Sequence, residues 1–232
     1  MIDLSKFDEN DPSQHQMKIL FGCGAKYGFR GNSEHTFLEV SSIVHGTFPK
    51  RHPYAGYTYY GFEGMLDKTN NLSYHQDYVR ECKDAMRLPK MNDDPTSDDI
   101  AGSIERFLKK LAPGQTRFYC KTVAKEHCVP DENGNMPLFY AHMPLGKSSI
   151  NKLFKEGAKI LGLPDPDSFC AYSLRAYFVT RLSNRKGVND EEHMVSAQHN
   201  SVDTSAIYQE RDCISESNKF AALGIAEPVR TR

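Results

Sequence analysis

The chain has 232 residues, enough for one domain with a sizeable hydrophobic core. Its 29 basic and 30 acidic residues give a formal net charge of -1, so it lacks the strongly basic composition of many nucleic-acid-binding domains. No apolar run approaches the roughly 20 residues of a membrane-spanning helix, and the first residues lack the pattern of a signal peptide. We therefore expect a soluble intracellular protein with no membrane partner.

Six cysteines are scattered along the chain without a CxxC pair. Reduced thiols are the expected state in a chain of this length that lacks an export signal. Cys120, His127, Cys128 and His142 share one region, but their spacing fits none of the usual zinc motifs. No metal site is expected.

The first predicted helix begins at Asp11-Pro12, an N-cap followed by a proline at the first helical position, and ends near Gly28. Arg30 would therefore lie just after a helix end. A second short helix is predicted from Ser33. Its outward residues are predicted to be Glu34 and Glu39, and its inward residues Phe37, Leu38 and Val40.

The middle of the chain combines strand and helix patterns. Residues 43–78 are rich in Tyr, Thr, Phe and Gly, which predicts a small antiparallel sheet with a turn at residues 69–71. Residues 83–97 are predicted to be a loop. Residues 98–111 carry apolar side chains at helical spacing and end before Pro113-Gly114. We expect a mainly α protein with a small antiparallel sheet, an α+β fold.

The second half begins with extended pieces in residues 117–145, joined by a turn at residues 131–134. Ser148 is predicted to cap a helix that ends at Gly162, and another helix should run from Tyr172 through Lys186. Leu174, Phe178 and Leu182 would be its inward residues. Shorter helices are predicted after Asn189 and around Tyr208.

Charge is unevenly distributed, because residues 147–186 hold eight basic but only three acidic residues. This pattern indicates either a basic face or the ordinary solvated surfaces of two helices. Lys147, Ser148 and Lys152, at a predicted helix start, are candidates to hold a DNA phosphate through side chains and backbone N–H groups. An ordinary capped helix explains them equally well.

Near the end of the chain stand Tyr172-Ser173-Leu174-Arg175, Gln198-His199 and Tyr208, in an order that suits attack by a tyrosine on a phosphodiester. A phenol has a pKa of about 10 and needs help to act near neutrality. Arginine forks can neutralise the phosphate without a metal, and a lysine or histidine can move a proton.

Residues 169–208 resemble the C-terminal signature of the tyrosine recombinase superfamily, a His-x-x-Arg box followed by Gly-His and, nine positions later, the nucleophile. The upstream segment Phe29-Arg30-Gly31-Asn32-Ser33-Glu34-His35 is similar to the first box of the Crypton subgroup of eukaryotic DNA transposons and of host proteins derived from them. Leu66-Asp67-Lys68-Thr69-Asn70 and Pro144-Leu145-Gly146-Lys147 look like further segments of that subgroup.

This resemblance implies a recombinase catalytic domain over about residues 15–215, followed by a tail at residues 216–232. It implies cleavage and rejoining of double-stranded DNA through a 3′-phosphotyrosyl bond without ATP, metal or other cofactor, in a synaptic homo-tetramer in the nucleus. The separate N-terminal DNA-clamping domain of the family is expected to be missing. Transferred by position, Arg30 and Arg175 clamp the phosphate, Lys68 is the general acid, His199 a phosphate ligand and Tyr208 the nucleophile.

Two positions depart from the family pattern: Tyr172 replaces histidine and Gln198 replaces glycine. Tyrosine can donate a hydrogen bond to phosphate but cannot shuttle a proton near neutrality as imidazole does. An alternative is therefore a weakened or inactive transposon-derived domain that binds DNA or protein. A hairpin-telomere resolvase is a third candidate that shares the chemistry. His35 is predicted to be a structural neighbour of the site.

Overall fold

The computed structural model describes residues 2–29, 31–63, 87–124 and 139–183. These residues form helices and two small antiparallel sheets, so the predicted α+β class is confirmed at that level. No helix within these ranges is long and apolar enough to cross a membrane.

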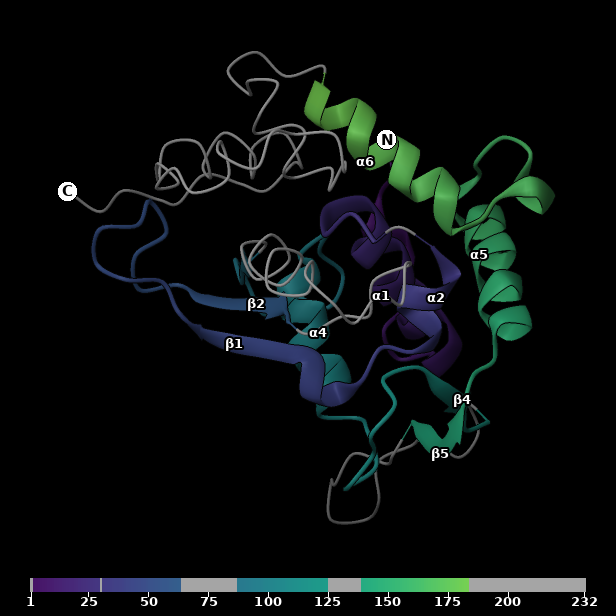
Figure 1. Cartoon of the computed structure of the whole chain (residues 1–232), viewed down its shortest axis with the longest axis horizontal. Coiled ribbons are helices and arrows are strands. Elements are labelled where there is room, and N and C mark those ends of the chain that lie inside the picture. The colour runs from purple at the N-terminus through teal and green to yellow at the C-terminus, as the bar shows by residue number, and fades with distance from the viewer. Residues whose placement is uncertain (1, 30, 64–86, 125–138, 184–232) are drawn as a thin grey trace, which may run out of the picture.

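Helix α1 (Pro12–Lys26) lies at the centre of the molecule (Figure 1). The Asp11 carboxylate accepts hydrogen bonds from two N–H groups of the first turn, and the chain leaves the helix at Tyr27, as predicted. Helices α4 (Ile100–Leu108), α5 (Lys147–Leu161) and α6 (Ala171–Ser183) all pack against α1. Because it is enclosed on several sides, α1 buries polar as well as apolar residues.

The caps of α5 correct one prediction and confirm another. The N-cap is Gly146, without a side-chain hydrogen bond, and Ser148 lies within the first turn instead of capping it. Gly162 ends the helix in the left-handed conformation with φ 68°, as predicted. A short 3-10 helix, η4 (Pro166–Ser168), then leads toward α6.

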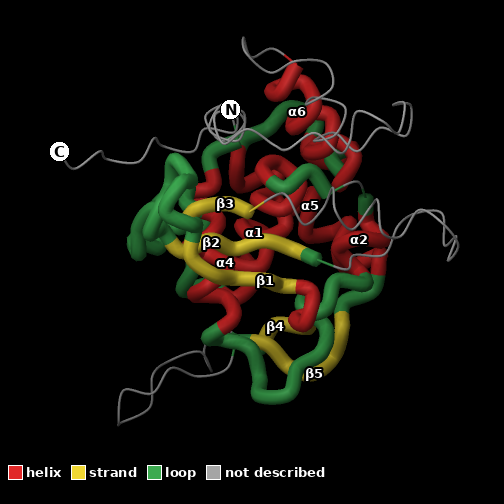
Figure 2. Tube along the Cα trace, turned by 60° about the vertical axis from the view of Figure 1, so that its left-hand side comes forward, coloured by secondary structure: helices red, strands yellow, loops and turns green. Residues whose placement is uncertain are grey.

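Three strands form the larger sheet in the order β1-β2-β3, shown in Figure 2: β1 (Ile43–Thr47), β2 (Thr58–Phe62) and β3 (Arg87–Pro89). Strand β3 falls in residues 83–97, predicted to be a loop, so that prediction was wrong for residues 87–89, while residues 90–97 form no helix or strand, as predicted. Three residues carry too little periodicity to indicate a strand, and β3 owes its conformation to pairing with Tyr59, Tyr60 and Gly61. The turn predicted at residues 69–71 lies outside the described residues.

The smaller sheet pairs β4 (Cys120–Thr122) with β5 (Tyr140–Pro144), with an irregularity between Cys120 and Thr122. Both strands lie in the region predicted to be extended. The turn predicted at residues 131–134 lies outside the described residues.

The short helix α2 (Asn32–Thr36) differs in part from its predicted pattern. Leu38 is buried and Glu39 exposed, as expected, but Glu34 is buried and Phe37 is 42% exposed. The helix ends before Phe37, and the chain then runs beside residues 116–118 before the 3-10 helix η2 (Val40–Ser42). A helical period therefore does not apply beyond Thr36.

Two glycines set how closely α6 approaches α1. A Cβ atom at Gly24 would lie 2.6 Å from Leu174 Cβ, and one at Gly28 would lie 2.6 Å from a ring carbon of Phe178. Gly28 also has φ 70°, a conformation that side chains disfavour. Leu174 and Phe178 are both buried, as predicted, while Leu182 has no described side chain.

A buried carboxylate links the start of the chain to α1 and α4. Glu9 lies 2.8 Å from the Lys18 ammonium and accepts two hydrogen bonds from Arg106, at 2.7 and 2.9 Å. Lys18 also donates to the carbonyl oxygens of Pro95 and Ser97. Burial acts to raise the pKa of Glu9, but Arg106, His15 and Lys18 outweigh it and lower the pKa to about 2. The carboxylate therefore stays charged inside the core.

Replacing Glu9 with Gln should strongly destabilise the fold, because Lys18 and Arg106 would lose the counter-charge that offsets their burial. We expect the free energy of unfolding to fall by about 3 to 5 kcal/mol in urea titrations. Glu156→Gln is the matched control, since Glu156 lies 3.6 Å from Lys152 in a solvent-exposed pair, and it should change stability by less than about 0.5 kcal/mol. Equal effects of the two variants would contradict the role given to Glu9.

Candidate functional site

The six residues predicted to act in strand cleavage are divided between described and undescribed parts of the chain. Tyr172 and Arg175 lie on α6. The predictions for Arg30, Lys68, His199 and Tyr208 concern residues outside the described ranges, as does the departure at Gln198.

Arg175 is fixed by the meeting of α6 with the end of α1. Its side chain is buried, and its Nη1 donates a hydrogen bond of 2.7 Å to the backbone carbonyl of Gly28. The guanidinium carbon lies 5.8 Å from the ring centre of Phe178, within cation–π range. Gly28 precedes Arg30 by two positions in the sequence. The hydrogen bond therefore connects Arg175 to the backbone segment that leads to Arg30.

Tyr172 lies one helical turn before Arg175 and has the opposite environment. Its side chain is 69% exposed, whereas that of Arg175 is buried. Residues three positions apart lie on the same side of a helix. Tyr172 and Arg175 are therefore neighbours on α6, with Tyr172 exposed to solvent and Arg175 buried. The exposed hydroxyl is available to a ligand in solvent.

The first turn of α6 favours negative charge, as the thiol of Cys170 shows. Burial acts to raise its pKa, but hydrogen bonds from the Ser173 backbone and hydroxyl and from the Tyr172 backbone outweigh burial and lower the pKa. The start of a helix has this effect on a nearby anion, although the Ser173 N–H also donates to the Cys170 carbonyl at 3.0 Å. Tyr172 belongs to the same turn.

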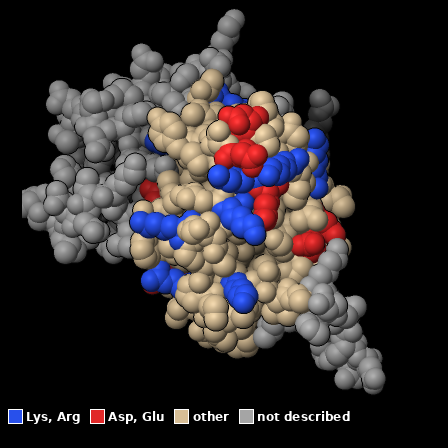
Figure 3. All heavy atoms as spheres, turned by 90° about the vertical axis from the view of Figure 1, so that its right-hand side faces the viewer, with Lys and Arg blue, Asp and Glu red and all other residues tan. Residues whose placement is uncertain are grey.

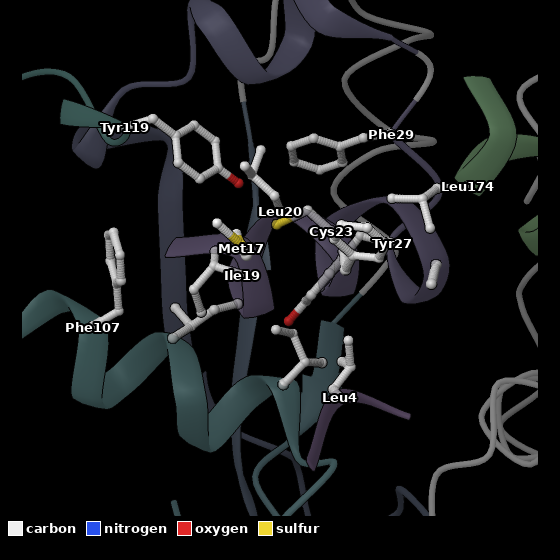
Figure 4. Packing of buried hydrophobic residues seen from close by; sticks show 14 of the residues in the cluster. Leu4, Met17, Ile19, Leu20, Cys23, Tyr27, Phe29, Phe107, Tyr119 and Leu174 are labelled. Atoms are coloured by element: carbon white, nitrogen blue, oxygen red, sulfur yellow. The ribbon is translucent and has the colours of Figure 1, made fainter. Parts of the chain in front are cut away.

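His35, predicted to be a structural neighbour of the site, is a fully buried core residue. Its ring packs against Phe29, Tyr119 and Phe154, with Nδ1 3.4 Å from the Tyr119 hydroxyl. Figure 4 shows Phe29 and Tyr119 facing Cys23 and Leu20 of α1. Nε2 has no hydrogen-bond partner among the described residues. Burial lowers the pKa of His35 to about 3, so its imidazole is neutral near pH 7.

The candidate phosphate site at the start of α5 is exposed. Lys147, Ser148 and Lys152 all lie at the surface, and Lys152 pairs with Glu156. Figure 3 shows basic and acidic side chains interspersed on the side of the molecule that carries α5, where Lys159 also pairs with Asp167 at 2.8 Å. The described part of residues 147–186 therefore favours solvated helix surfaces over a continuous basic face.

Two further residues extend this site and were not found from the sequence. The exposed ring of Phe37 has the Arg117 guanidinium 5.4 Å and the Lys147 ammonium 5.9 Å from its centre. Phe37 reaches Arg117 because Leu38 accepts a hydrogen bond from the Phe118 backbone. Only this long-range pairing brings the three side chains together, so no local pattern could have indicated them. Glu39 forms an isolated β-bridge with Arg117 through backbone atoms, so an acidic residue lies beside these cations in the fold.

The thiols and candidate metal ligands give no further site among the described residues. Cys23, Cys120 and Cys170 are free, and no three His, Cys, Asp or Glu side chains within these ranges gather around one point. His127 and Cys128 lie outside the described residues.

Comparison with known proteins identifies no relative: no family model, no curated protein and no solved structure matches the chain.

The buried imidazole of His35 should make stability depend on pH. Its pKa in the folded state is about 3, below the ordinary 6.5, so the unfolded chain takes up the proton first and stability falls as pH drops from about 6.5 toward 3. In His35→Phe, the loss of unfolding free energy between pH 7 and 5 should be smaller by about 2 kcal/mol.

Urea titrations at pH 7, 6 and 5 test this expectation. His142→Phe, at an exposed position of β5, serves as the control and should keep the slope of the unmodified protein. Some slope will remain in His35→Phe, because burial also lowers the pKa of His15 to about 3. Identical slopes for His35→Phe and the unmodified protein would refute the assignment.

Proposed function

We propose that this chain is a tyrosine recombinase catalytic domain of Crypton type, which cleaves and rejoins strands of double-stranded DNA. The observation that carries the proposal is the buried hydrogen bond from Arg175 to the Gly28 carbonyl. Two arginines must meet at one phosphate in this chemistry, and the contact ties the box of Arg175 to the backbone two residues before Arg30. The two boxes are 145 positions apart in the sequence, from Arg30 to Arg175.

The arrangement of the larger sheet supports the role proposed for Lys68. Strands β2 and β3 pair antiparallel, and Lys68 belongs to the stretch of chain that connects them. A lysine in the connection between two paired strands matches the hairpin lysine that the resemblance implies. Tyr172 lies in the first turn of α6, and a helix start is a favourable place for a phosphate.

In the proposed reaction, the Tyr208 hydroxyl releases its proton to solvent water and its oxygen attacks the phosphorus. The bond from phosphorus to the 5′-oxygen breaks, and Lys68 donates a proton to that oxygen. Arg30 and Arg175 neutralise the non-bridging oxygens, with hydrogen bonds from His199 and Tyr172. Attack by a 5′-hydroxyl on the phosphotyrosyl bond reverses these steps, so the enzyme needs no energy source.

The same proposal includes the partners. Exchange of both strands of two duplexes requires four active sites, which implies a homo-tetramer on DNA and, for a eukaryotic element, a nuclear location. Lys147, Ser148 and Lys152, joined by Phe37 and Arg117, would contact the DNA backbone.

A covalent adduct tests the reaction directly. A pool of nicked duplexes of mixed sequence lets the cut strand diffuse away and traps the phosphotyrosyl bond, which survives denaturing gel electrophoresis. The unmodified protein should form the adduct and Tyr208→Phe should form none, because phenylalanine has no attacking oxygen. Tyr177→Phe, which removes a hydroxyl from α6 beside Arg181, should still form it. An adduct in Tyr208→Phe would exclude Tyr208 as the nucleophile.

A second candidate function, a non-catalytic DNA-binding or interaction domain, is favoured by Tyr172. This residue occupies the position of the usual histidine, and its exposed phenol cannot act as a proton shuttle near neutrality. Binding of DNA without any adduct, equally in the unmodified protein and Tyr208→Phe, would support this candidate over the enzyme.

Tyr172→His should speed adduct formation, because imidazole can both hydrogen-bond the phosphate and carry a proton. We expect an increase on the order of tenfold or more in the single-turnover rate. The exposed position should keep the change in unfolding free energy within about 0.5 kcal/mol. The control Tyr172→Phe should slow the reaction. A rate that is the same for histidine and phenylalanine would show that this position takes no part.

A further inference from the structure

The connection between β1 and β2, residues 48–57, extends beyond the sheet and away from α5 and α6, as Figures 1 and 2 both show. We propose that this loop is a DNA-backbone contact that grips phosphates with Lys50 and Arg51. The inference rests on the proposed function, which supplies duplex DNA as the partner, but it concerns a surface that no step of the reaction uses.

The loop and its strands carry no negative charge. None of the 30 acidic residues of the chain lies within residues 40–62, although Glu39 and Glu63 flank that stretch. Lys50 and Arg51 are exposed, and neither forms an ion pair with any residue that the structure describes. Among the described residues, the exposed Lys109 and Lys159 do pair with carboxylates, whereas Lys121 is exposed and unpaired like Lys50 and Arg51. Two adjacent cations without a counter-charge favour an anionic partner.

The loop is held in shape by its own side chains. The His52 ring stacks on Phe48 with centres 4.0 Å apart and planes 9° from parallel, and Tyr54 is fully buried. Backbone hydrogen bonds join Phe48 to both Tyr57 and Gly56, and Ala55 donates to the carbonyl of His52. Lys50 and Arg51 therefore project from a preorganised support, which lowers the entropy lost on binding.

Hydroxyl groups beside the cations suit the same partner. Thr47 and Thr58 face each other across the base of the loop, and both are exposed. Threonine hydroxyls, lysine and arginine are frequent donors to DNA phosphates. Residues 47–58 offer hydrogen-bond donors and contain no carboxylate, a combination that fits a row of phosphate oxygens.

The test compares equilibrium binding of a mixed-sequence duplex at several salt concentrations, in the Tyr208→Phe background so that no covalent step contributes. Lys50→Gln/Arg51→Gln should weaken binding on the order of tenfold and reduce the slope of log affinity against log salt by about two. Lys109→Gln/Lys121→Gln removes two charges from exposed positions, one directly after α4 and one in β4, and should leave the slope unchanged.

Unchanged affinity and slope in Lys50→Gln/Arg51→Gln would overturn the inference, while adduct formation would still decide the proposed function separately. An equal loss in both double variants would also overturn it, because the effect would then reflect net charge alone. Loss of binding to vesicles containing phosphatidylserine, without any loss on DNA, would reassign the loop to a membrane surface and likewise contradict the proposal.

Discussion

The fold depends on the enclosure of α1, which buries four of its polar side chains, His15, Gln16, Lys18 and Lys26. Lys18 and His15 are fully buried there, and the charge of Lys18 is tolerated only because Glu9 and two carbonyl oxygens surround its ammonium. These buried contacts hold α1 in one position, and so they also fix the position of its C-terminal end. Gly28 presents its carbonyl to Arg175 at that point, so the geometry of the candidate site derives from the core.

Features set by local chemistry could be predicted from the sequence. The start of α1 at Asp11-Pro12 and the end of α5 at Gly162 follow from caps whose partners lie within a few residues. Features set by distant partners could not. Strand β3 exists through pairing with β2, and Phe37 faces solvent because its segment runs beside residues 116–118.

The same distinction applies to the candidate site. The motifs that resemble recombinase boxes are local sequence patterns, and the prediction for Arg30 concerns a residue outside the described ranges. The burial of Arg175 and its bond to Gly28 could not be predicted from the sequence, because they arise where two helices distant in sequence meet. The charge pattern of residues 147–186 left a basic face and solvated helix surfaces equally open, and the pairing of Lys152 with Glu156 and of Lys159 with Asp167 in space favours the second.

The bond between Arg175 and Gly28 has a consequence for how such a domain would change over evolutionary time. A lineage freed from selection for DNA cleavage would still be selected to retain this arginine, because losing it would leave a buried carbonyl without its donor. Tyr172, exposed and marginal to packing, would be free to drift. Among descendants of an active ancestor, the arginine would record common folding, whereas an exposed residue such as Tyr172 would record whether the chemistry was kept.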